Sequence, residues 1–153
     1  MKSRLNSYQV APAVMQAMQA LEAAAEKGGL EPSLVALVKI RASQINGCAF
    51  CLHMHTRDAR AKGENEQRIY LLNAWRESPL YSDRERAALA WTESVTLVSE
   101  THVPDDVFAQ AKAQFTEGEQ VQLTLLIGAI NTWNRFSVGL RVAHPVDAPR
   151  AAA

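Results

Sequence analysis

The sequence predicts an all-α fold: a single domain of six to seven helices. Apolar residues recur every three or four positions along most of the chain, and no segment alternates apolar and polar residues as a half-buried strand would. Glycine and proline residues stand at the boundaries of these runs, where helices end or begin. A length of 153 residues suits one core. We therefore expect residues 1–153 to form one domain, with its core at about 10–143 and a loosely ordered, flexible tail at 144–153.

The first half of the chain is expected to hold an N-terminal arm at residues 1–9 and four helices. Pro12 and Pro32 suit the first turn of a helix, where a missing N–H costs nothing. Asn46-Gly47, Gly63 and Ser78-Pro79 are typical of helix ends. The predicted helices cover residues 12–27, 32–45, 48–62 and 64–76. In the second of them, we expect Lys39 and Arg41 to lie at a solvated or interface edge.

Three more helices are predicted in the second half, at about 83–100, 104–115 and 117–140. Ser82 and Thr116 are each followed three residues later by glutamate, the pattern of a capping box. Asn131 and Asn134 are polar exceptions in the last helix, and we expect them to be satisfied core amides. This helix is otherwise apolar nearly all round, which indicates that it is central in the fold or buried between subunits. Burial between subunits would make the protein a homo-oligomer.

The composition argues against several classes of function. Lys+Arg and Asp+Glu both number 16, so the formal charge is zero and nothing favours binding to nucleic acid or an anionic membrane. No run reaches the ~18 apolar residues of a membrane span, and the N-terminus lacks an apolar signal core. We expect a cytoplasmic protein. Its two cysteines are too few for a disulfide framework and indicate redox or metal chemistry instead.

Both cysteines fall in the segment Asn46-Gly47-Cys48-Ala49-Phe50-Cys51-Leu52-His53-Met54-His55-Thr56. The Asn-Gly pair predicts that one helix stops and that Cys48 and Cys51 lie in the first turn of the next. The dipole at a helix start favours thiolate, the reactive form of cysteine. His55 follows Cys51 by four residues and Cys48 by seven, so all three share one face. This face could supply a nucleophile, a resolving thiol and a base.

Other interpretations of these residues stay open. The cysteines could be small buried hydrophobes. A zinc site is disfavoured because His53 points about 140° round the helix from Cys48, and we expect neither a metal nor a cofactor. Glu93, in a run of small and apolar residues, could pair with an arginine at the helix surface or act as a proton-relay partner for His55.

Two segments carry a resemblance to a known family. Residues 43–56 resemble the AhpD-like core of the carboxymuconolactone decarboxylase superfamily, and residues 81–93 resemble the helix that follows it. The resemblance covers most of residues 10–143. It implies an all-helical fold that assembles as trimers or hexamers, and a thiol peroxidase cycle. Cys51 would attack a small-molecule peroxide, Cys48 would resolve the sulfenic acid as a disulfide, and His55 would relay protons. A protein dithiol or a lipoyl protein would reduce the disulfide.

This chain departs from the family pattern at two positions. Ala36 stands where the family peroxidase has a relay glutamate, and Phe50 stands where it has a histidine between the cysteines. The relay must then be incomplete or rebuilt, with Glu93 as the candidate. The predicted function is a thiol-dependent alkyl hydroperoxide reductase. The alternatives are a carboxymuconolactone decarboxylase-like lyase, a general disulfide reductase and a non-catalytic helical oligomer. Retention of both cysteines favours the redox functions.

Overall fold

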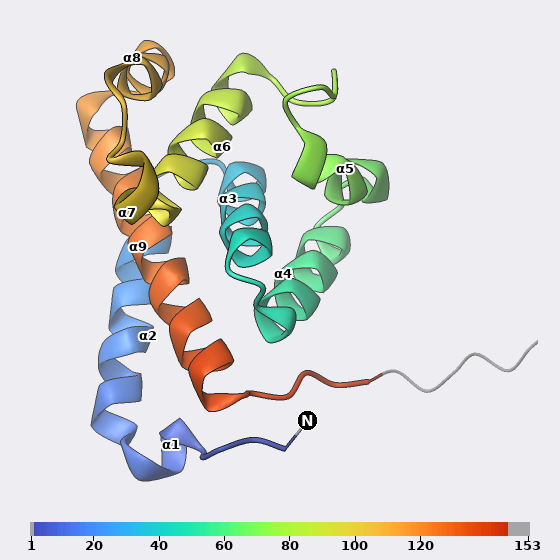
Figure 1. The fold of residues 1–153 in the computed structure, drawn as a ribbon, viewed down its shortest axis with the longest axis vertical. Helices are drawn as coiled ribbons and strands as arrows, with labels where there is room; N and C mark the ends of the chain where they lie inside the picture. The colour runs from blue at the N-terminus through green and yellow to red at the C-terminus, as the bar shows by residue number, and fades with distance from the viewer. Residues whose placement is uncertain (1, 147–153) are drawn as a thin grey trace, which may run out of the picture.

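The computed structural model describes residues 2–146, and their regular structure is entirely helical. The all-α prediction is confirmed (Figure 1). The elements are α1 (Ser7–Val10), α2 (Pro12–Glu26), α3 (Pro32–Ile45), α4 (Ala49–Ala61), α5 (Glu66–Leu71), the 3-10 helix η1 (Leu72–Ala74), α6 (Asp83–Thr96), α7 (Val98–Thr101), α8 (Asp105–Gln114) and α9 (Glu117–Leu140). The predicted tail lies outside the described residues from position 147 onward.

Three predicted elements differ from the observed ones. The expected arm contains the short helix α1, because the Asn6 side chain accepts hydrogen bonds from the N–H groups of Tyr8 and Gln9 and so caps it. The single helix expected at 64–76 is instead two consecutive elements, the α-helix α5 and the 3-10 helix η1. A final 3-10 turn is common at the end of an α-helix. The helix expected at 83–100 is interrupted at Leu97. There the Thr101 hydroxyl donates to the Ser94 carbonyl (2.7 Å) and competes with the regular helical bond.

Helices α3 and α9 organise the core. Helix α9 packs against α2, α3 and α6, and α2 and α9 lie side by side although they are far apart in the sequence (Figure 1). One buried cluster joins these four helices; its largest members include Leu34, Val38, Leu123, Leu126 and Ile127. A second cluster joins α3 to α4, α5, η1 and α6, and includes Leu37, Ile40, Ile69, Leu72 and Leu89. Helix α3 contributes to both clusters and therefore lies between them.

Helix α9 is central, as one of the two sequence interpretations had it, but it also reaches the surface. Leu123, Leu126 and Ile127 are fully buried, whereas Val121 and Val138 are 72% and 49% exposed. The exposed valines are compatible with an oligomer, which stays a prediction. In the described part of the chain no helix has the length and apolar character to cross a membrane.

The two faces of α9 give a matched test of this packing. Leu126→Ala removes a side chain that is 0% exposed, and we expect it to lower the free energy of unfolding by about 2–5 kcal/mol. Val121→Ala, on the exposed face of the same helix, is expected to change it by no more than about 0.5 kcal/mol. Urea unfolding followed by circular dichroism measures both. Equal effects of the two substitutions would show that the first cluster is not the core.

Candidate active site

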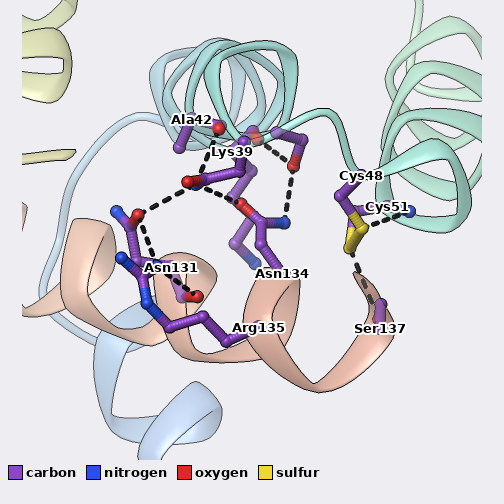
Figure 2. Close-up of a disulfide and its surroundings, with 10 residues drawn as sticks. Lys39, Ala42, Cys48, Cys51, Asn131, Asn134, Arg135 and Ser137 are labelled. Atoms are coloured by element: carbon purple, nitrogen blue, oxygen red, sulfur yellow. Dashed lines mark hydrogen bonds between the residues drawn. A yellow bond between two sulfur atoms is a disulfide. The ribbon is translucent and has the colours of Figure 1, made fainter. Parts of the chain in front are cut away.

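The two cysteines lie at the turn between α3 and α4. Asn46 ends α3, and Gly47 then adopts a left-handed φ of +63°, which glycine tolerates without strain. Cys48 is the N-cap of α4, and its Sγ accepts a hydrogen bond from the Cys51 N–H at 3.3 Å. A disulfide joins Cys48 and Cys51, whose Cα atoms lie 5.4 Å apart (Figure 2). The sequence therefore placed the pair correctly at the start of a helix.

A buried network of amides holds this turn against α9. The Asn46 side-chain amide donates to the Oδ1 atoms of Asn131 and Asn134, both at 2.9 Å. The Asn134 amide in turn donates to the Ser43 hydroxyl at 3.1 Å, and the Cys48 N–H donates to the Ser43 carbonyl at 3.0 Å. Figure 2 shows Asn131 and Asn134 reaching from α9 toward α3. The sequence prediction that these two asparagines are satisfied core amides is confirmed.

A cavity of about 250 Å³ opens beside Cys51. Helix α4 supplies half of its lining, and α1, α2 and α9 supply the rest. The lining residues are Tyr8, Glu22, Phe50, Cys51, Met54, His55, Trp133 and Ser137. The Ser137 Oγ lies 3.7 Å from the Cys51 Sγ (Figure 2). Larger hollows of about 270, 330 and 480 Å³ lie elsewhere, but none of these three is lined by a cysteine or a histidine.

His55 shares this cavity with Cys51, one helical turn further along α4. Burial lowers the pKa of its imidazole from 6.5 to about 4, and the positive charge of Lys39 adds to this effect. The ring is therefore neutral at pH 7, and a neutral imidazole offers one nitrogen that can accept a proton. The structure thus brings Cys48, Cys51 and His55 together.

Lys39 was expected at a solvated or interface edge, and this expectation is wrong. Lys39 is only 4% exposed. Its ammonium pairs with two carboxylates of α2, those of Glu22 and Glu26, and the distance to Glu26 is 2.5 Å. The Trp133 indole N–H donates to Glu22 Oε2 at 3.0 Å. Sequence reasoning missed Glu22 as a cavity residue. Glu22 and Glu26 are four residues apart on one face of α2, but nothing in the sequence says which helices that face meets.

Glu93 lies outside the residues that line the Cys51 cavity. Its Oε1 accepts hydrogen bonds from Arg41 and from the Trp75 indole, both at 2.8 Å, and its other oxygen pairs with Arg76. Burial raises the pKa of Glu93, but hydrogen bonds from Trp75 and Arg76 outweigh this effect, so the pKa lies below 4.5. These contacts match the alternative in which Glu93 pairs with arginine.

The two departures from the family pattern have different surroundings. Ala36 packs against the second hydrophobic cluster and does not line the Cys51 cavity, whereas Phe50 does. His53 points elsewhere and stacks on His144, with ring centroids 5.3 Å apart. Within residues 2–146, no three His, Cys, Asp or Glu side chains are grouped so that they could hold a metal ion.

Comparisons with known proteins agree on one family and one fold. The profile of the Carboxymuconolactone decarboxylase family matches residues 12–94. The Bacillus subtilis protein YdfG, which is uncharacterized, is 43% identical over 92% of this chain and 95% of its own length.

Two solved structures show the same fold. The crystal structure of ATU0492 from Agrobacterium tumefaciens, a protein of unknown function provisionally named antioxidant defence protein AhpD, has a TM-score of 0.93 at 48% identity. The match covers 95% of this chain and all of that one. The debrominase Bmp8 has a TM-score of 0.79 at 18% identity, over 88% of this chain and 72% of its own, which shows the fold alone.

The depressed pKa of His55 gives a direct test of its surroundings. We expect its imidazole to titrate near pH 4 in the oxidised protein, as followed by NMR and assigned by loss of the signal in His55→Asn. Because the unfolded state binds this proton more readily, stability falls as pH drops from about 6.5 to about 4. His55→Asn should flatten that part of the profile of stability against pH. A midpoint near 6.5 would mean that the ring is open to solvent.

Proposed function

This chain belongs to the Carboxymuconolactone decarboxylase family, and within that family we propose that it reduces alkyl hydroperoxides with the Cys48–Cys51 dithiol. One observation carries the proposal: a disulfide-forming pair at the start of α4 borders a cavity that also holds a neutral imidazole. Thiols in such surroundings react with peroxides as thiolates. The provisional name of the Agrobacterium neighbour supports the same function.

In the proposed first step, Cys51 is the peroxidatic cysteine because it lines the cavity and Cys48 does not. His55 accepts the proton of the Cys51 thiol, and the thiolate attacks the terminal oxygen of the hydroperoxide. The O–O bond breaks, and the leaving alkoxide takes a proton from the imidazolium. The products are an alcohol and Cys51 sulfenic acid, so the peroxide gains two electrons and the sulfur loses two.

Cys48 completes the cycle in the second step. The N-cap position and the Cys51 N–H favour negative charge on the Cys48 sulfur. This thiolate attacks the sulfenic sulfur of Cys51, hydroxide leaves as water after protonation, and the Cys48–Cys51 disulfide forms. A protein dithiol or lipoyl partner then supplies two electrons and two protons to restore the thiols. A relay role for Glu93 stays a prediction, and its pairing with Arg41 and Arg76 favours a structural role.

Cysteine variants test the proposed function. Reduced wild-type protein mixed with cumene hydroperoxide is expected to lose both thiols and release cumyl alcohol. Cys51→Ser should abolish alcohol release, because no peroxidatic thiolate remains. Cys48→Ser should release one equivalent and stop at a Cys51 sulfenic acid that dimedone traps. Thiol titration, alcohol quantification and mass spectrometry give these readouts.

The same variants separate the alternatives. Turnover that persists in Cys51→Ser would contradict the proposal. Decarboxylation of a lactone acid that survives in the double Cys→Ser variant would favour the lyase. Reduction of small disulfides without any reaction with peroxide would favour a general disulfide reductase.

A further inference from the structure

The wall of the Cys51 cavity is mostly apolar and aromatic. Phe50 and Met54 come from α4, Trp133 comes from α9, and Tyr8 of α1 is 53% exposed. A volume of about 250 Å³ equals roughly eight groups the size of a water molecule or methylene, at ~30 Å³ each. Such a cavity suits a compact hydrocarbon group with one ring, and it is too small to enclose a long acyl chain.

The charge on this wall has one sign. Among the described lining residues, Glu22 is the one carboxylate, and no lysine or arginine is present. Its Oε1 pairs with Lys39 and its Oε2 accepts from Trp133, so both oxygens are fixed in place. Lys39 does not line the cavity and also pairs with Glu26, so two carboxylates share one ammonium. A negatively charged substrate would meet a carboxylate and find no cation opposite it.

From these contacts we propose that the cavity selects compact aromatic hydroperoxides that are uncharged or cationic, and that Glu22 is the residue that rejects anionic ones. This inference rests on the proposed peroxidase function and adds the substrate class. Glu22 acts here as a fixed charge, because its hydrogen bonds to Lys39 and Trp133 occupy both oxygens. Like charges a few Å apart repel, and the apolar wall around Glu22 offers an anionic group no cation in compensation, so one carboxylate is sufficient for discrimination.

The test compares three hydroperoxides that carry different charges at the para position: cumene hydroperoxide, its para-carboxylate and its para-trimethylammonium derivative. Steady-state kcat/KM is measured at pH 7.5 with a small dithiol as reductant. We expect the anionic substrate to fall about tenfold or more below the neutral one, which corresponds to ~1.4 kcal/mol. The cationic substrate should equal or exceed the neutral one. In Glu22→Gln, whose amide oxygen still accepts from Trp133, the ratio of neutral to anionic kcat/KM should fall below about threefold.

Glu26→Gln is the matched control. It removes the same charge and the other partner of Lys39, but Glu26 does not line the cavity, so the ratio should stay at its wild-type value. Wild-type protein gives an independent measurement if Glu22→Gln does not fold. Raising the ionic strength shortens the Debye length from ~30 Å at 0.01 M to ~3 Å at 1 M, and it should narrow the ratio.

The failures of the two proposals are distinguishable. No turnover of any of the three substrates by wild-type protein would overturn both the peroxidase function and the inference. Equal turnover of the neutral and anionic substrates would overturn the inference alone. A preference that persists in folded Glu22→Gln, or that ignores salt in the wild-type protein, would assign the selection to shape and not to Glu22.

Discussion

The candidate active site depends on the hydrogen bonds between Asn46 and the asparagines of α9. Buried amides must be fully paired, and a network of this kind stabilises one arrangement of the helices it joins. Here it joins the last turn of α3 to the middle of α9, through Asn131, Asn134 and the Ser43 hydroxyl. Since Gly47 and Cys48 follow directly, the place where α4 begins is determined by how α3 docks on α9. The position of the cysteines therefore depends on how the core packs.

The same packing sets the electrostatics of the site. Helix α3 carries Lys39 into a position that water barely reaches, and a buried ammonium is tolerated only with partners. Helix α2 supplies these partners as Glu22 and Glu26. The positive charge of Lys39 in turn helps to keep His55 neutral. A thiolate on Cys51 would act in the opposite direction and favour the imidazolium. In the proposed cycle, His55 would therefore hold the proton mainly while negative charge is present on sulfur or on the leaving alkoxide.

Most of the fold, and the placement of the cysteines and His55, could be predicted from features that are local in the sequence. Helical periodicity, proline starts and glycine stops gave the all-α class and most boundaries, and the spacing Cys48, Cys51, His55 gave their common face. The predictions were wrong where segments that are distant in the sequence contact each other. The break at Leu97 depends on a hydroxyl of Thr101, and the burial of Lys39 depends on carboxylates of another helix. Glu93 could not be decided from sequence, because its arginine and tryptophan partners come from α3 and the end of η1.

Ala36 and Glu22 show why a motif read at fixed spacing is an incomplete description of a site. The spacing along α3 reveals that a carboxylate is absent at position 36, but it says nothing of α2, which contacts the cavity only because it packs on α9. The carboxylate at Glu22 also differs in chemistry. A carboxylate that carries protons needs an oxygen free to exchange them, and both oxygens of Glu22 are engaged by Lys39 and Trp133. In the proposed function, the thiols therefore come from α4 and the charge that faces the substrate comes from α2, so a substitution in one helix can change one property without the other.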